Sequence, residues 1–196
     1  MKLKFKKNEN IFKQGNIFTH IINICKGKVK ICHENESGKK TILSIKKENS
    51  IIGSEFVYKS DICNYSIVAI EDCEIYLIDI NYLKIILQNN NELSGFIQKL
   101  VVEKLEKITQ FYINRTNKQV VGRIADVIIF LSEEIFKSQS FTLPLSRKEL
   151  SEFAGCSQEN IINTLSKFDK EGIIKTDGEK IEILNIDTLK RISKHG

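Results

Sequence analysis

The hydrophobic pattern of this chain changes its period near residue 89, and that change limits the folds it can adopt. Before residue 89, short apolar or alternating runs separated by polar turns are typical of β-strands. From residue 89 to residue 117, apolar residues recur every three or four positions, which is typical of a helix. We therefore expect a β-domain, then one long helix, then a further domain.

Five strands are predicted in the first part of the chain, at residues 21–25, 29–32, 41–45, 66–70 and 74–78. A polar turn that contains Gly38 separates the second strand from the third, and an acidic turn separates the last two. Short strands at intervals of about ten residues indicate an all-β barrel, roll or sandwich. We assign this domain to residues 1–88.

The segment 89–117 contains no proline and one glycine, and we predict one long helix there. Its apolar stripe needs a partner, and the same helix of a second copy is the economical one, because a dimer pairs identical surfaces. The alternative is that the helix packs on its own β-domain. The predicted dimer interface consists of Leu93, Ile97, Val101, Leu105, Ile108 and Tyr112.

Residues 118–196 are predicted to contain helices followed by a hairpin. One helix covers about residues 118–136, and an extended break at 142–145 follows it. Ser146 and Glu149 have the spacing of a capping box, in which each side chain bonds to the other residue's backbone N–H. A helix is therefore expected to begin there.

That helix ends near Gly155, which permits the left-handed backbone of a tight turn. Ser157 is a second N-cap and begins a helix that ends near residue 171. Strands at 173–176 and 180–183 then flank a predicted Asp177-Gly178 turn. Two helices around a glycine turn, followed by a hairpin, predict a winged helix-turn-helix.

Charge does not by itself direct this domain to nucleic acid. Residues 118–196 carry 12 Lys and Arg against 12 Asp and Glu, so their net charge is zero. Binding must therefore rest on individually placed side chains and helix ends. We place Gln158, Glu159, Ile162 and Asn163 on the outer face of the second helix, where such helices touch base edges. Lys175, Thr176 and Lys180 of the hairpin could reach phosphate.

These features resemble the Crp/Fnr family of bacterial transcription regulators over nearly the whole chain. NENIFKQG and ICKGKVKI, at residues 8–15 and 24–31, resemble the entry into the family's cyclic-nucleotide-binding-like β-roll. Residues 51–55 resemble the segment that leads into its effector pocket. Residues 145–183 resemble its C-terminal signature.

The resemblance implies an α+β fold with three parts. These are an N-terminal double-stranded β-helix (β-roll) sensor at 1–88, a dimerisation helix at 89–117 and a winged helix-turn-helix DNA-binding domain at 118–196. It implies three partners: double-stranded DNA with a near-palindromic operator, a second copy of the chain, and RNA polymerase.

Ser146 and Arg147 match family positions that touch the DNA backbone. The predicted DNA-binding residues are Ser146, Arg147, Ser157, Gln158, Glu159, Asn163, Lys167, Lys175 and Lys180.

The predicted effector pocket departs from the cyclic-AMP-responsive members. Those members hold the cyclic phosphate with an Arg-Ser or Arg-Thr pair, whereas residues 62–66 contain no Arg, nor does any residue before Arg115. Because Arg offers a bidentate fork for phosphate, we expect that the chain does not bind cyclic nucleotides; Lys59 is the alternative point charge. The predicted pocket residues are Gly53, Ser54, Glu55, Asn64, Tyr65 and Ser66.

The reading helix also departs from the family. Members commonly carry Arg where this chain has Asn163, and many carry Arg in place of Gln158, whereas Glu159 is retained. Arg reads guanine, Asn and Gln suit adenine, and Glu can accept from the amine of cytosine. The operator should therefore differ from the commonest half-site of the family.

No metal or other cofactor is predicted. An iron–sulfur cluster needs closely grouped cysteines, and the five cysteines of this chain are scattered, so we expect them to pack as small apolar side chains. Haem ligation through His20 or His33 stays open, although a surface histidine is the simpler interpretation of each. The cysteines are Cys25, Cys32, Cys63, Cys73 and Cys156.

Two other classes of function compete with a transcription regulator. A cupin-like metal enzyme would need several histidines in the β-domain, which has two, and no catalytic motif occurs, so we expect no enzyme. A signalling adaptor could use the winged helix for protein contacts. No apolar run approaches the ~18 residues of a membrane span, and we expect a soluble, cytoplasmic protein without membrane partners.

Overall fold

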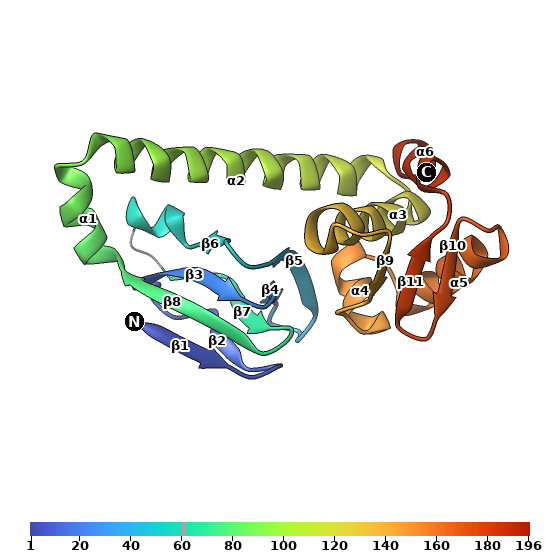
Figure 1. Cartoon of the computed structure of the whole chain (residues 1–196), viewed down its shortest axis with the longest axis horizontal. Helices are drawn as coiled ribbons and strands as arrows, with labels where there is room; N and C mark the ends of the chain where they lie inside the picture. Colours follow the sequence, from blue (N-terminus) through green and yellow to red (C-terminus); the bar gives the residue numbers. More distant parts are fainter. Residues whose placement is uncertain (60–61) are drawn as a thin grey trace. The chain divides into compact units, whose positions relative to one another are not determined.

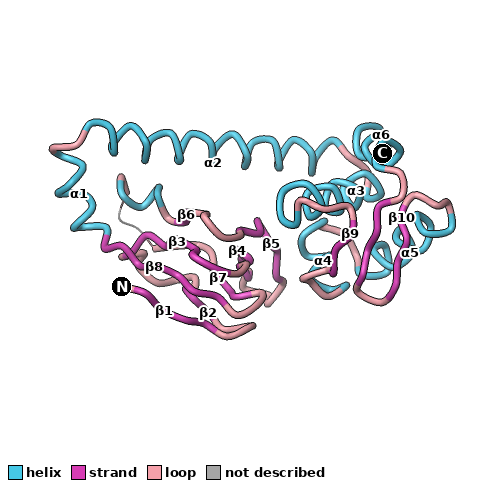
Figure 2. The backbone as a smooth tube through the Cα atoms, viewed as in Figure 1, coloured by secondary structure: helices cyan, strands magenta, loops and turns pink. Residues whose placement is uncertain are grey.

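The computed structural model describes residues 1–59 and 62–196. The chain divides into two compact units, Met1–Phe111 and Tyr112–Gly196. Figure 1 colours the chain from its N-terminus to its C-terminus, and Figure 2 draws helices in cyan and strands in magenta. The boundary between the units falls inside helix α2, Asn91–Asn117, so this helix contributes residues to both.

The first unit contains two four-stranded sheets, with the strand orders β1-β8-β3-β6 and β2-β7-β4-β5. All of their strand pairs are antiparallel. The predicted β-roll is confirmed; β1, β2 and β6 are additional to the five predicted strands. The strands are β1 (Lys2–Phe5), β2 (Asn10–Phe12), β3 (His20–Lys26), β4 (Val29–Glu34), β5 (Lys40–Lys46), β6 (Ile51–Ile52), β7 (Ser66–Ala69) and β8 (Cys73–Asp79).

The two sheets share one apolar core. Ile24 and Ile75 from the first sheet and Val29 and Ile67 from the second are fully buried in it. The alternation predicted for β4 turns Val29 and Ile31 inward and Lys30 between them outward. Burial of one such side chain contributes about 1.5–3 kcal/mol, so this core holds the sheets together.

Two helices follow the sheets, and Figure 1 shows the bend between them. Helix α1, Ile80–Gln88, was not predicted; the Asp79 carboxylate caps it by accepting two backbone N–H groups of its first turn, at 2.8 and 3.0 Å. Helix α2 begins at Asn91 rather than at the predicted residue 89. The Asn90 side chain accepts the backbone N–H of Leu93 at 2.9 Å, which fixes this start.

The apolar stripe of α2 divides into two parts. Ile97 is 4% exposed and belongs to the core of its own β-roll, against which Leu93 also packs. Ile97 therefore has little surface left for the predicted dimer contact, and its burial agrees with the alternative that this part of the helix packs on its own β-domain. Further along, Leu105, Ile108 and Tyr112 are 63%, 54% and 67% exposed. This second part of the stripe is largely exposed.

The second unit begins with helix α3, Val120–Phe130, which continues into a π-helical turn, Leu131–Phe136. The predicted helix at 118–136 is therefore present, with its last turn wound wider. Helix α6, Ile186–His195, packs on α3 through the fully buried Leu189 and was not predicted. The other elements are β9 (Ser140–Thr142), α4 (Arg147–Ala154), α5 (Gln158–Lys170), β10 (Ile174–Asp177) and β11 (Lys180–Ile183), and the sheet order is β10-β11-β9.

Within residues 1–59 and 62–196, no helix combines the length and apolar character that a membrane crossing requires. In the same ranges, no group of three or more His, Cys, Asp or Glu side chains could hold a metal ion.

Candidate DNA-binding interface

Helix α4 begins with the predicted capping box. Ser146 Oγ accepts the backbone N–H of Glu149 at 3.2 Å, and the Glu149 carboxylate accepts the backbone N–H of Ser146 at 2.8 Å. Leu150 and Ala154 are buried, so this helix packs through the face that the sequence indicates. It ends at Gly155, whose φ of 66° lies in the left-handed region that favours glycine.

Helix α5 begins two residues later, at the predicted cap. Ser157 Oγ accepts the backbone N–H of Asn160 at 3.1 Å. Ile161 and Leu165 are buried and anchor the helix from its inner face. The outer face near the helix start is exposed, and it consists of Gln158, Glu159, Ile162 and Asn163. We call these four residues the reading row.

The hairpin β10-β11 forms the wing, with its turn displaced by one residue from the prediction. Asp177 pairs with Lys180, so the two central residues of the turn are Gly178 and Glu179 instead of Asp177 and Gly178. Gly178 has a φ of 58°, as the first central residue of a type II′ turn requires. The wing lysines Lys175 and Lys180 are exposed.

Two contacts fasten the wing to the helices. Arg147 Nη2, at the start of α4, donates to the carbonyl oxygen of Gly178 at 2.9 Å. The Asp169 carboxylate, on α5, accepts the backbone N–H of Thr176 at 3.0 Å and also its hydroxyl. Thr176, which the sequence offered as a phosphate contact, is thus engaged within the protein. Asp169 was not predicted, because its role depends on the tertiary contact between α5 and the wing.

One nitrogen of the Arg147 guanidinium lacks an acceptor. Its Nη1 is buried and has no hydrogen-bond partner among the described residues. Burial lowers the pKa of the Arg147 guanidinium, and the Glu179 carboxylate opposes that shift. A buried donor without an acceptor is unfavourable, and a phosphate oxygen placed between α4 and the wing would satisfy it.

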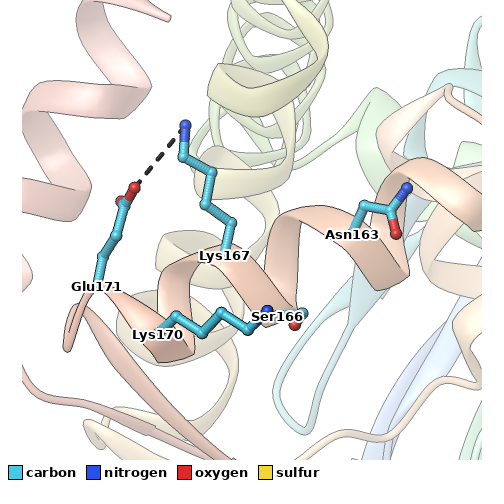
Figure 3. A pocket seen from close by; sticks show the side chains of 5 residues that line it. All are labelled: Asn163, Ser166, Lys167, Lys170 and Glu171. Carbon is cyan, nitrogen blue, oxygen red and sulfur yellow. Dashed lines mark ion pairs between the residues drawn. The ribbon is translucent and has the colours of Figure 1, made fainter.

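Further cations follow the reading row toward the end of α5. Figure 3 shows Asn163, Ser166, Lys167, Lys170 and Glu171, which line a groove of about 380 Å³. Lys167 lies 3.9 Å from the Glu171 carboxylate and is exposed, so this ion pair is weak. Lys170 is exposed on the same helix. Ser146 and Ser157 are also exposed at the starts of their helices.

The predicted effector pocket lies in the other unit, and the structure brings only part of it together. Tyr65 Oη donates to Glu55 Oε1 at 2.8 Å, and Lys104 of α2 donates to the same oxygen. The Lys104 ammonium also lies 5.4 Å from the centre of the Tyr65 ring. Lys104 was not predicted, because nothing in its local sequence reveals which β-roll residue it meets.

The remaining pocket residues have other roles. The carbonyl of Asn64 bonds to His33 Nδ1 at 2.7 Å, and Ser66 Oγ accepts the backbone N–H of Gln14 at 3.0 Å. Ser54 is buried in the turn Ser54–Val57. Asn64 and Ser66 therefore do not join the Glu55–Tyr65–Lys104 cluster through these bonds.

Three phenylalanine rings pack in the interior beside Gly53. Gly53 has a φ of 91°, and a Cβ there would lie 2.0 Å from the Phe18 ring. Phe18 stacks on Phe56 with centroids 4.6 Å apart and contacts Phe12 at 4.7 Å. Aromatic side chains thus occupy the space under Gly53.

Comparison with protein families matches both units of the chain. A cyclic nucleotide-binding domain matches residues 2–90, and a Crp-like helix-turn-helix domain matches residues 122–192. The two matches cover the β-roll and the winged helix-turn-helix described above.

Comparison with individual proteins agrees with these matches. The chain is 22% identical to the transcriptional activator protein FnrA of Stutzerimonas stutzeri, over 92% of this chain and 75% of that protein. It is 21% identical to the cAMP-activated global transcriptional regulator CRP of Salmonella typhimurium, over 92% and 88%. FixK2 from Bradyrhizobium japonicum has the same fold, with a TM-score of 0.88 and 16% identity over 98% of this chain and 96% of that one.

Proposed function

Because the chain belongs to the Crp/Fnr family of transcription regulators, we propose that it acts as a homodimer that reads a near-palindromic DNA operator. The observation that carries this proposal is the reading row. It is exposed at the capped start of α5, next to a wing that bonds to both α4 and α5. In a helix-turn-helix protein, the N-terminal end of the recognition helix contacts base edges in a major groove.

The chemistry of the reading row suggests which bases it contacts. Glu159 accepts from a cytosine amine, and Gln158 and Asn163 make paired hydrogen bonds with adenine. Phosphate contacts then come from the residues around the row, which set the register of the protein on DNA without reading sequence. The proposed phosphate-contacting residues are Ser146, Arg147, Ser157, Lys167, Lys175 and Lys180.

The exposed part of the α2 stripe supports dimerisation. Val101, Leu105, Ile108 and Tyr112 are spaced by four, three and four residues, the spacing of a coiled-coil seam. A second copy would cover three side chains that are more than half exposed in one chain. Two subunits joined in this way read half-sites about 34 Å apart.

The β-roll is proposed to work without a cyclic nucleotide. Glu55 already accepts from Tyr65 and Lys104, and the neighbouring space is filled by Phe12, Phe18 and Phe56. No Arg is present in this unit to grip a cyclic phosphate. We further propose RNA polymerase as a protein partner. We also propose a cytoplasmic location, because a regulator works where the transcribed DNA lies.

The deciding experiment selects binding sites from random DNA and titrates variants against the preferred site and its single-base changes. Glu159→Ala should remove discrimination at one base pair by about 1–3 kcal/mol and leave non-specific affinity equal or higher. Asp187→Ala removes the same charge from exposed α6 and is the matched control. If no preferred site emerges, or if Glu159→Ala weakens every sequence equally, the assignment fails and a protein-binding adaptor becomes the better interpretation.

A further inference from the structure

One guanidinium group holds the turn that precedes the reading helix. Arg123, on α3, donates from Nε to the carbonyl of Ala154 at 3.1 Å and from Nη2 to the carbonyl of Gly155 at 3.2 Å. Its Nη1 donates to the carbonyl of Lys118 at 3.1 Å, just after the end of α2. Arg123 therefore connects the exit of α2 to the turn between α4 and α5.

A second arginine covers the same turn. Arg115 belongs to the last turn of α2, and a Cβ built on Gly155 would lie 2.3 Å from its Nη2. The Arg115 guanidinium thus rests directly over Gly155. Burial raises the pKa of the thiol of Cys156, the next residue, and the charges of Arg123 and Arg115 oppose that shift. The turn is enclosed by two cations that lie outside α4 and α5.

The carbonyl groups at the end of α4 explain why positively charged side chains pack against this turn. The carbonyls of Ala154 and Gly155 lie at the end of α4, where a helix leaves its last carbonyl oxygens without intrahelical partners. The same end carries the negative partial charge of the helix dipole. A guanidinium supplies both donors and charge, and it holds the two carbonyls in one fixed geometry.

The turn in question sets the direction of α5. Ser157, which caps α5, comes two residues after Gly155, and the reading row begins immediately after Ser157. A small rotation of the backbone at residues 154–156 would displace the reading row relative to the wing. DNA contacts need side chains held within hydrogen-bond geometry, so such a displacement weakens base readout before it weakens phosphate attraction.

We propose that Arg123 is a positioning residue for base readout. It fixes the α4–α5 turn, and through Lys118 it links that turn to the end of the helix proposed to form the dimer. This inference rests on the proposed function for its consequence at DNA. Whether Arg123 holds the turn in place can be measured on the protein without DNA.

The first measurement is hydrogen exchange on the full-length protein without DNA. Arg123→Met should speed exchange of the backbone amides at residues 154–160 by about tenfold or more, because charge-assisted hydrogen bonds are lost. Amides of β11 should stay unchanged. Arg191→Met is the matched control, since Arg191 is exposed on α6 and its guanidinium bonds locally to Thr188 at 3.2 Å. Unchanged exchange at 154–160 would overturn the inference, whatever happens with DNA.

The second measurement titrates the same variants against the selected site and against random DNA at two salt concentrations. Arg123→Met should lose about tenfold or more in affinity for the preferred site, with unchanged random-DNA affinity and salt slope. Arg123→Lys, which can still donate to one or two carbonyls, should recover part of the loss.

Two results of the titration would contradict the positioning role. A salt slope reduced by about one would make Arg123 a phosphate contact. An equal loss on both DNAs together with a lower melting temperature would make its role one of stability alone. If the wild type selects no site, the proposed function fails, and the exchange result still decides whether Arg123 fastens the turn.

Discussion

The Tyr65 hydroxyl donates a 2.8 Å hydrogen bond to Glu55 Oε1, the same carboxylate oxygen that accepts from Lys104. Glu55 is a residue of the predicted effector pocket, and two side chains of the same unit share one of its oxygens. Its other oxygen, Oε2, is buried without a hydrogen-bond partner among the described residues. One oxygen of this carboxylate thus links the β-roll to α2.

Cyclic nucleotides should not bind at this place. Isothermal titration with cyclic AMP or cyclic GMP is expected to show no binding tighter than millimolar, because no Arg is available and Glu55 is engaged. Micromolar binding with a change in DNA affinity would contradict this and would point to Lys59 or backbone amides as the phosphate site.

Loss of Lys104 should destabilise the first unit. Lys104→Met leaves Glu55 with Tyr65 alone, and we expect the free energy of unfolding to fall by about 1–2 kcal/mol, since partial exposure screens the pair. Urea denaturation measures the change. Lys99→Met is the control: Lys99 lies 3.9 Å from Glu103 on the surface of the same helix, and the expected cost is about 0.5 kcal/mol or less. Equal effects of the two changes would remove the special role of Lys104.

The Tyr65 phenol should stay neutral in the folded protein at high pH. Burial raises its pKa, and the neighbouring Glu55 carboxylate adds to the shift. Wild type and Tyr65→Phe should therefore gain equal phenolate absorbance when folded and differ by one tyrosine when unfolded. Because the unfolded chain releases this proton near pH 10 and the native state retains it, stability should fall as the pH rises above about 10. A larger gain in the folded wild type would contradict the burial.

The exposed part of the α2 stripe should form the dimer. Leu105→Glu combined with Ile108→Glu places like charges in the seam, so sedimentation equilibrium should show a monomer that no longer binds the operator. Ile85→Glu, on the exposed face of α1, is the control and should remain dimeric. A double variant that stays dimeric would move the interface to the β-roll.

Lys167 should contribute phosphate attraction without sequence preference. Lys167→Ala is expected to weaken all DNA sequences alike and to lower the salt slope by about one. The control is Lys190→Ala, which removes the same charge from α6, where Lys190 lies 2.7 Å from Glu133. A loss confined to one base pair would instead make Lys167 a base-reading residue.

The helix caps and the glycine turn of the second unit could be predicted from neighbouring residues alone. The Ser146–Glu149 box, Gly155 and the Ser157 cap each depend on neighbouring residues, and each appears as expected. The wing turn lies one residue later than the Asp-Gly signal indicates, since Asp177 pairs with Lys180 and Ile174 with Ile183. Gly178 thereby takes the first central position of a type II′ turn, which glycine favours, and either register would keep Ile174 on the buried face.

Tertiary contacts account for what the sequence did not reveal. Lys104, Asp169 and Arg123 each lie in a helix with ordinary helical neighbours, and their partners come from distant segments. Ile97 belongs to the same period as Leu105, and only the contact with the β-roll separates the two. A helical period shows which side chains share a face and leaves open what covers each of them.

The reading row has a consequence for how this protein can change over generations. Among the described residues, the side chains of Gln158, Glu159 and Asn163 are exposed and have no hydrogen-bond or ion-pair partner. Substitutions at such surface positions usually alter stability by no more than about 0.5 kcal/mol. Under the proposed base readout, a new preferred DNA sequence can therefore arise by point mutation without loss of fold, whereas a side chain at Gly155 would clash with Arg115. The DNA target could then change one base pair at a time while the scaffold stays the same.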